Sequence, residues 1–290
     1  MPELPEVETT AGLIRPHLLG RRIRSVEVDW ERTLGGQASD DFARDVVGAT
    51  LVKVGRRAKY ITMDLERGGR PAGGLLVHLR MTGRLMVDPA SEPVPDYRRV
   101  SLRLAPGEPG RDWLHFVDVR KFGRFAFHHD LGQQLAHLGP EPLGGEFTVD
   151  WLRRALAGRQ RAIKPLLLDQ TFLAGLGNIY VDESLHRAGI HPLRRSDRIP
   201  RERVVLLFEA IRAILAQAIE REGSSFDAFY RTPEGQPGSY QHLFQVYGRE
   251  GQPCRGCGRA IRRIVVGQRG THYCTRCQPA PRKPTSPHKS

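Results

Sequence analysis

Four cysteines, the only ones in the chain, lie close together near its C-terminal end. They form two C-x2-C pairs separated by sixteen residues: Cys254 with Cys257, and Cys274 with Cys277. This spacing is typical of a zinc site in which each pair turns two sulfurs towards one tetrahedral ion. Four thiolates leave no coordination position for a substrate, so we predict one structural zinc ion. The alternatives are two disulfides, which a reducing cytoplasm disfavours, and four thiols that bind no metal.

The first residues of the chain offer a nucleophile. Pro2 follows the initiator methionine, and a small second residue favours removal of that methionine. The chain would then begin with a secondary amine whose pKa is about 8, so that a fraction of the molecules carries a neutral, nucleophilic amine near pH 7. Such an amine adds to an aldehyde carbon to form an iminium, an electron sink that promotes elimination. Glu3 and Glu6 lie within reach as proton donors. An ordinary frayed N-terminus is the alternative.

A lysine and a glycine-rich turn are further candidates. Residues 59–65 alternate with period two, which places Lys59 on the strand face of Ile61, Met63 and Leu65. Partial burial there would lower the pKa of the lysine towards the range useful for proton transfer, unless the side chain reaches solvent at a strand end. The turn GLGN at residues 175–178 precedes a helical stretch. Its backbone N–H groups suit a phosphate, although the same letters also suit a tight structural turn.

Charge and hydropathy limit the partners. Lys and Arg number 45 against 32 Asp and Glu, a net charge of +13, which favours nucleic acid over a merely basic soluble protein. Residues 251–290 hold nine Lys or Arg and no acidic residue, which indicates a contact surface or a tail. The longest apolar run, residues 204–208, has five residues, whereas a membrane span needs about 18. The acidic opening lacks the features of a signal peptide, so we expect a cytoplasmic protein with no membrane partner.

The elements that must position these residues change character along the chain. Residues 23–127 contain short alternating runs broken by glycine and proline, at 67–71 and 105–110 for example, and no intervening helices are expected. This pattern predicts an antiparallel β-sandwich or barrel. A leading helix is expected over residues 9–19, interrupted by Pro16.

Helical periodicity replaces the strand pattern after a linker near residues 138–145. Helices are expected over residues 148–157, 163–169, 182–188 and 203–222, with Gly189 and Gly223 ending the last two. The cysteine module follows, with strands at residues 261–266 and 271–273 forming a small ribbon. Residues 279–290 carry almost no apolar side chain and are expected to be disordered.

Nine short motifs, taken together, resemble those of the bacterial formamidopyrimidine-DNA glycosylase family, also called Fpg or MutM. The opening MPELPEVETT is the most informative of them. The others run through nearly the whole chain in family order: RAKY at 57–60, HLRMTG at 78–83, DVRKFG at 118–123, LGPEP at 138–142, AIKP at 162–165, AGLGNIY at 174–180, AGIHP at 188–192 and QVYGR at 245–249. Each alone is weak, but in this order, with the cysteine module, they are highly specific.

The resemblance implies a fold, a partner and a reaction. The fold is α+β and multi-domain: a catalytic antiparallel β-sandwich, a helical helix–two-turn–helix domain and a four-cysteine zinc ribbon. We expect domain limits of 1–137, 138–147 (linker), 148–253, 254–277 (ribbon) and 278–290 (tail). The partner is damaged double-stranded DNA, bound by a monomer. The reaction is removal of oxidised purines, chiefly 8-oxoguanine and formamidopyrimidines, followed by strand cleavage through β- and δ-elimination.

The resemblance also assigns residues to this chemistry. Pro2 is the nucleophile that forms the Schiff base, Glu3 the proton donor that helps to open the sugar, and Lys59 the general acid–base for β-elimination. Arg269, in the ribbon, serves δ-elimination and contacts phosphate.

A second set of residues is assigned to DNA binding. Met81 and Phe122 fill the gap left by the extruded base, and Arg120 meets the orphaned cytosine. Without the family, Met81 reads as a core residue and Phe122 as a turn aromatic. Asn178 grips a phosphate, and Tyr97 and Arg159 stand at further DNA-contact positions. The family usually carries histidine where this chain has Tyr97 and lysine where it has Arg159. Residues 222–241 correspond to the family loop that covers the extruded purine.

Two rival interpretations remain. An endonuclease VIII-like enzyme would prefer oxidised pyrimidines, but the opening string and the long loop before Gln245 disfavour it. A catalytically idle zinc-ribbon protein would bind DNA without needing Pro2, Glu3 or Lys59.

Overall fold

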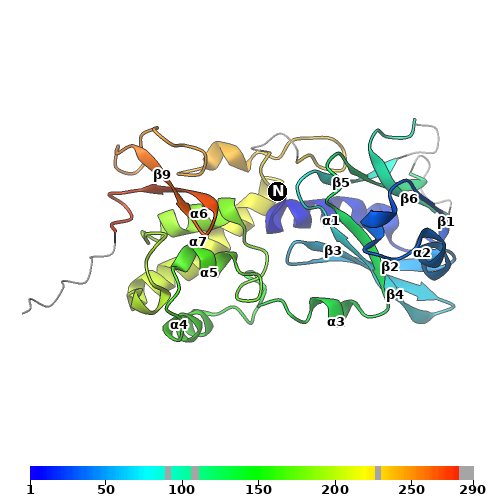
Figure 1. Cartoon of the computed structure of the whole chain (residues 1–290), viewed down its shortest axis with the longest axis horizontal. Coiled ribbons are helices and arrows are strands. Elements are labelled where there is room, and N and C mark those ends of the chain that lie inside the picture. The colour runs from blue at the N-terminus through cyan, green and yellow to red at the C-terminus, as the bar shows by residue number, and fades with distance from the viewer. Residues whose placement is uncertain (89–92, 106–110, 226–229, 281–290) are drawn as a thin grey trace, which may run out of the picture. The chain divides into compact units, whose positions relative to one another are not determined.

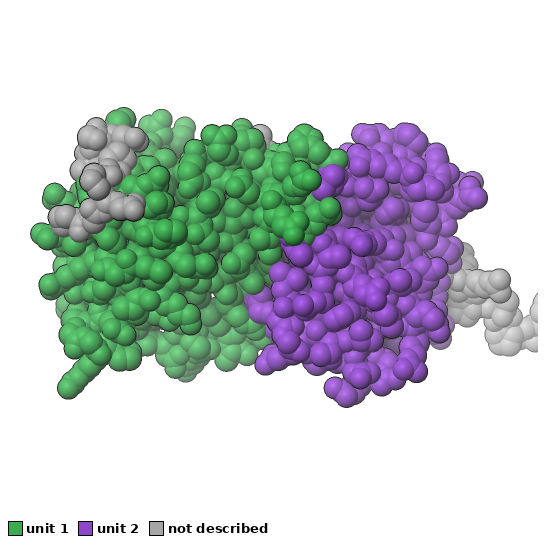
Figure 2. All heavy atoms as spheres, turned by 180° about the vertical axis from the view of Figure 1, so that it is seen from behind, with its two compact units in different colours: residues 1–138, 217–242 green, residues 139–216, 243–290 purple. Residues whose placement is uncertain are grey.

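The computed structural model describes residues 1–88, 93–105, 111–225 and 230–280. The chain divides into two compact units, coloured separately in Figure 2. Unit 1 comprises Met1–Leu138 and Gln217–His242, and unit 2 comprises Gly139–Ala216 and Leu243–Ser290. The predicted disordered tail falls mostly on residues 281–290, and most of the predicted loop at 105–110 falls on residues 106–110; both stretches lie outside the described residues.

Two four-stranded antiparallel sheets form the centre of unit 1 (Figure 1). The first has the order β1-β6-β7-β5 and the second the order β2-β3-β4-β8. Alternating side chains such as Ile61, Met63 and Leu65 are buried, and they join side chains of the other sheet in one core. The predicted sandwich is thereby confirmed. The strands are β1 Ile23–Val28, β2 Thr50–Arg57, β3 Tyr60–Arg67, β4 Arg70–His78, β5 Gly83–Asp88, β6 Arg98–Leu104, β7 Trp113–Asp118 and β8 Arg124–His128.

The leading helix of unit 1 is longer than expected. Helix α1 spans Leu4–Leu18 and continues through Pro16 in its last turn. Pro5 is tolerated in the first turn because backbone N–H groups have no intrahelical partner there. The buried side chains of α1 recur at helical spacing and pack into the core of the unit; they include Val7, Ala11, Ile14 and Leu18.

The expectation of strands without intervening helices is wrong at one place. A 3-10 helix at Glu31–Leu34 and helix α2 at Ser39–Val46 lie between β1 and β2. Phe42 and Val46, four residues apart, are both fully buried. Two buried side chains are enough to dock a two-turn helix, but they are too few to reveal its period in the sequence. A short third helix, α3, spans Leu131–Leu135.

Unit 2 contains three of the four helices predicted after the linker, most of the fourth, and the ribbon. Helix α4 spans Val149–Ala157 and is capped by Thr148, whose hydroxyl accepts from the backbone N–H of Trp151 at 3.1 Å. The other elements are α5 Ile163–Leu168, α6 Asn178–Arg187, β9 Ile261–Val266 and β10 Arg269–Cys274. Helix α6 begins four residues before the predicted start, at Asn178.

The longest helix contributes to both units. Helix α7 spans Arg201–Glu220, and the division between the units falls within it, after Ala216. Gly223 follows it with a left-handed φ of +78°. None of the helices that the structure describes combines the length and the apolar character needed to cross a membrane.

Candidate functional site

The N-terminus is ordered and buried. Pro2 is buried, and only 3% of the surface of Glu3 is exposed. The backbone N–H of Glu3 donates to the carboxylate of Glu6 at 2.8 Å, and the Glu3 carbonyl accepts from Val7 at 3.1 Å. These bonds hold the predicted nucleophile at the start of α1, so the frayed terminus is excluded.

Glu6 also forms hydrogen bonds that connect α1 to a segment of unit 1 that lies 218 or more residues away in the sequence. Its carboxylate accepts from the Ser224 backbone N–H at 2.7 Å and from the Ser224 hydroxyl at 3.2 Å. The Tyr230 hydroxyl donates to the Glu6 carbonyl at 3.3 Å. Burial, followed by the nearby charge of Glu6, raises the pKa of Tyr230 above its usual value of 10.0. Ser224 and Tyr230 flank part of the predicted lesion-covering loop, of which residues 226–229 lie outside the described residues.

Lys59 lies in the turn that joins β2 to β3, just before β3 begins. Only 7% of its surface is exposed, so the solvent-facing alternative does not hold. Burial, then the charges of Arg80 and Lys59, lowers the pKa of His78 to about 3. The same end of β2 is joined to α1 by an ion pair of 2.8 Å between Arg56 and Glu8.

Four predicted DNA-contact residues stand at turns of the sandwich. Met81 is half-buried rather than in the core, because β4 ends at His78 and the chain turns before β5. Tyr97 is 57% exposed and Phe122 is 51% exposed. The guanidinium of Arg120, an exposed residue, lies 4.8 Å from the centre of the Phe122 ring, within the range of a cation–π contact.

Unit 2 carries the other predicted contacts. Arg159 is exposed and packs its guanidinium 5.0 Å from the centre of the Phe172 ring. Arg269 is exposed at the first position of β10, directly after Gln268, which has a left-handed φ of +61°. Asn178, the first residue of α6, is half-buried and donates its side-chain N–H to the Gly270 carbonyl at 2.9 Å.

A buried ion pair, which was not predicted from the sequence, connects strand β10 to helices α5 and α6. Lys164 on α5 and Asp182 on α6 are both fully buried, and Nζ lies 2.6 Å from Oδ1. Lys164 Nζ also donates to the Gly270 carbonyl at 3.2 Å, and Asp182 Oδ2 accepts from the His272 backbone N–H at 2.8 Å. The only signal of this ion pair in the sequence is the AIKP motif, which contains Lys164 but does not identify Asp182 as its partner.

The four cysteines meet in one cluster. Their sulfur atoms all lie within 4.8 Å of one another, with Cys254 and Cys277 3.8 Å apart and Cys257 and Cys274 3.4 Å apart. A tetrahedral zinc ion with Zn–S bonds of about 2.3 Å requires sulfur separations of about 3.8 Å, so the cluster suits this metal. No disulfide joins any two of the four cysteines, which excludes the disulfide alternative.

A histidine outside the ribbon accompanies this cluster. His186 Nε2, on α6, lies 3.6 Å from Cys254 Sγ. Imidazole groups beside metal-bound thiolates help to orient them. Its position was not predicted, because it lies 68 residues from the cysteine that it contacts.

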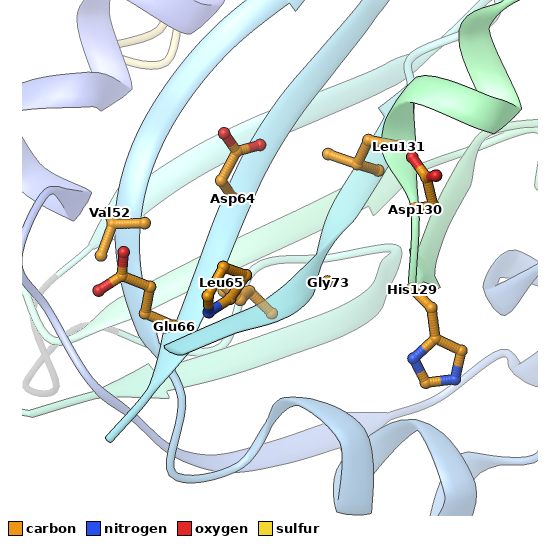
Figure 3. Close-up of a pocket in the computed structure, with 9 residues that line it drawn as sticks. Val52, Asp64, Leu65, Glu66, Gly73, His129, Asp130 and Leu131 are labelled. Atoms are coloured by element: carbon orange, nitrogen blue, oxygen red, sulfur yellow. The ribbon is translucent and has the colours of Figure 1, made fainter. Parts of the chain in front are cut away.

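A pocket of unit 1 lies apart from the predicted site residues. It has a volume of about 270 Å³ and is bounded by β2, β3, β4 and the start of α3. Figure 3 shows the carboxylates of Asp64, Glu66 and Asp130 around it, with His129 at one side. None of the residues assigned to catalysis or DNA contact lines this pocket.

Comparison with known families matches three consecutive parts of the chain. The formamidopyrimidine-DNA glycosylase N-terminal domain matches residues 1–125, and the formamidopyrimidine-DNA glycosylase H2TH domain matches residues 138–229. The zinc finger found in FPG and IleRS matches residues 251–280. The chain belongs to the formamidopyrimidine-DNA glycosylase family. This family comprises DNA-repair enzymes with glycosylase and AP lyase activity, and the chain is an enzyme of this class. Its cysteine cluster is the zinc site of the family's zinc finger.

Individual relatives agree over nearly the full length. The formamidopyrimidine-DNA glycosylase of Xanthomonas campestris pv. campestris (strain B100) is 42% identical over 280 residues, covering 96% of this chain and 100% of the relative. The crystal structure of MutM (Fpg) from Thermus thermophilus superposes with a TM-score of 0.83 at 40% identity, covering 96% of this chain and 98% of that one. A wild-type Lactococcus lactis Fpg (MutM), solved in complex with DNA containing N7-benzyl-Fapy-dG, gives 0.86 at 34% identity, covering 96% and 100%.

Proposed function

We propose that this protein removes oxidised purines, 8-oxoguanine and formamidopyrimidines, from duplex DNA and then cleaves the strand at the resulting abasic site. The observation that carries the proposal is the buried N-terminus, where Pro2 precedes Glu3 and hydrogen bonds to Glu6 and Val7 hold the backbone in place. A protein that only binds DNA would not need a nucleophile in a buried, hydrogen-bonded N-terminus. The family relationship supports the same reaction class.

The proposed chemistry begins with the amine of Pro2 after Met1 has been removed. The amine attacks the anomeric carbon, the glycosidic bond breaks, and the base leaves with the bonding electron pair and takes up a proton. Glu3 donates a proton to the ring oxygen as the sugar opens, which leaves an iminium between Pro2 and the sugar carbon. The buried Lys59 assists the departure of the base, and it is the acid–base group of the β-elimination in which a proton is removed and the 3′ phosphate is expelled.

The second elimination expels the 5′ phosphate, and hydrolysis of the iminium then frees Pro2. The exposed Arg269 contacts phosphate during this step. Zinc, when bound, keeps the strand that carries Arg269 folded; the four thiolates leave it no part in the reaction.

The remaining residues bind the duplex. Met81 and Phe122 occupy the space of the extruded nucleotide, and Arg120 offers its donors to the orphaned cytosine. Asn178 and Arg159 contact backbone phosphates. Tyr97 is a DNA contact in which a hydroxyl stands in place of the usual imidazole.

We place the protein in the bacterial cytoplasm as a monomer acting on chromosomal DNA. Domain limits of 1–137, 148–253 and 254–277, with a linker at 138–147 and a tail at 278–290, are also proposed.

Borohydride trapping on duplexes that each carry one defined lesion tests the function. We expect a covalent adduct with 8-oxoguanine or formamidopyrimidine duplexes, and peptide mapping that places the link at residue 2. Pro2→Gly keeps a free amine but loses the secondary amine, and it should weaken base excision and strand cleavage together. A link at Lys59 would refute the assignment of the nucleophile. Selective trapping on oxidised pyrimidines would favour the endonuclease VIII-like alternative instead.

A further inference from the structure

A buried carboxylate organises the turn that carries Arg120. Asp118 is 1% exposed, and three donors converge on its two carboxylate oxygens. The backbone N–H of Arg120 donates to Oδ1 at 3.2 Å, and that of Gly123 donates to Oδ2 at 2.7 Å. The hydroxyl of Thr82 also donates to Oδ1, and in turn accepts from the Arg120 N–H at 3.2 Å. The turn between β7 and β8 is therefore tied to the turn between β4 and β5, which carries Met81.

The backbone of Asp118 extends this tie to a third segment. Its N–H donates to the carbonyl of Tyr97 at 3.0 Å. Its carbonyl accepts from the guanidinium of Arg99, a buried residue, at 2.8 Å. Residues at three turns, far apart in the sequence, thus share one hydrogen-bonded centre.

Backbone strain marks the same three turns. Arg80, Tyr97 and Lys121 are not glycines, yet their φ angles are +54°, +58° and +60°. Left-handed conformations of such residues persist where the surrounding structure fixes them, and they cluster at functional sites. Each strained residue lies within three residues of Thr82 or Asp118, or is bonded directly to Asp118.

We propose that Asp118 and Thr82 are positioning residues that hold Arg120, Met81 and Tyr97 in one rigid arrangement, and so determine the preference for the base opposite the lesion. The proposal rests on the proposed function, because it assumes that Arg120 reads that base. To distinguish cytosine from another opposite base, the guanidinium of Arg120 must keep a fixed orientation, because its N–H donors match the acceptors of one base only in that orientation. The side chain of Arg120 is exposed, so its direction is set by the backbone of the turn and by its contact with the Phe122 ring.

The chemistry of both side chains is required. A carboxylate can accept from all three donors, whereas the amide of asparagine presents an NH2 group to at least one N–H and would repel it. Thr82 must both donate and accept, so serine can replace it and the isosteric valine cannot.

Single-turnover excision of 8-oxoguanine opposite cytosine and opposite adenine tests the proposal. Asp118→Asn and Thr82→Val should lower the ratio of the two rates towards that of Arg120→Ala, a loss of roughly 5- to 150-fold for a good base contact. Thr82→Ser should keep the wild-type ratio. Cleavage of a single-stranded oligonucleotide with a preformed abasic site has no opposite base to read, so Asp118→Asn should slow this cleavage much less than it slows excision of 8-oxoguanine opposite cytosine.

The outcomes separate this proposal from the function on which it rests. A wild-type protein that excises no oxidised purine overturns the proposed function. A wild-type enzyme that excises both pairings equally, or an Asp118→Asn variant that keeps the wild-type ratio, overturns the positioning role alone. Equal losses on the duplex and the single strand would mean that Asp118 only supports the fold, as would failure of Thr82→Ser to retain the ratio lost by Thr82→Val.

Discussion

Replacing Lys164 with methionine should destabilise unit 2 far more than an ordinary substitution. The change removes an ammonium that lies 2.6 Å from Asp182 and 3.2 Å from the Gly270 carbonyl. Asp182 is fully buried and would be left with the His272 backbone N–H at 2.8 Å and the more distant His272 Nδ1 at 3.7 Å as its partners. Removing one partner of a buried pair costs about 3–5 kcal/mol, because the remaining charge is left unpaired away from water.

A second substitution distinguishes the lost charge partner from the lost packing. In the Lys164→Met background, Asp182→Asn removes the unpaired charge and keeps an oxygen that can accept from His272. The double variant should therefore be more stable than Lys164→Met alone. The coupling free energy of the double-mutant cycle should reach about 2 kcal/mol or more, within the range of directly contacting residues. If packing alone matters, the two effects will add and the coupling will be near zero.

Amide hydrogen exchange of the zinc-loaded protein measures the loss locally. A cost of about 3–5 kcal/mol corresponds to a roughly 100- to 4,000-fold fall in protection of the α5, α6 and β10 amides. The amides of β3 and β4, in unit 1, serve as the internal reference and should not change. Unchanged protection of α6 and β10 in Lys164→Met would refute the reasoning, and so would an equal fall in β3.

Three further predictions concern zinc, proton transfer and pH. Cys274→Ser should lose the metal and unfold the ribbon, because structural zinc contributes about 10–16 kcal/mol to such modules, while unit 1 stays folded; active protein without zinc by metal analysis would contradict this. Lys59→Ala should slow removal of 8-oxoguanine more than cleavage at a preformed abasic site, since a ready-made aldehyde needs less assistance; equal losses in single-turnover assays would mean that the lysine only holds DNA. The pKa of His78 is lowered to about 3 in the folded protein, so the unfolded chain takes up a proton first and stability falls as the pH drops below about 6.5. Between pH 7 and pH 5 this group should cost about 2 kcal/mol, and urea unfolding of His78→Gln should show a smaller loss than wild type; identical losses would exclude His78 as the source.

Local patterns in the sequence predicted much of the framework. The alternation of residues 59–65 correctly indicated a strand with Ile61, Met63 and Leu65 buried, because successive side chains of a strand point to opposite faces. It was wrong for Lys59, which lies in the turn before β3 and not on the strand. The C-x2-C spacing predicted the sulfur cluster for a similar reason, since each pair closes a tight turn of its own. Helix α2 escaped prediction because its buried face consists of only Phe42 and Val46.

Other features were decided only by the tertiary structure. Met81 continues the apolar alternation of β4, but it is half-buried because hydrogen bonding ends the strand at His78. The bond that joins Glu6 to Ser224 spans 218 positions, and the one that joins Thr82 to Asp118 spans 36. A buried polar residue carries no periodic signature of its partner, because the requirement to satisfy its hydrogen bonds can be met from any element that the fold brings into contact.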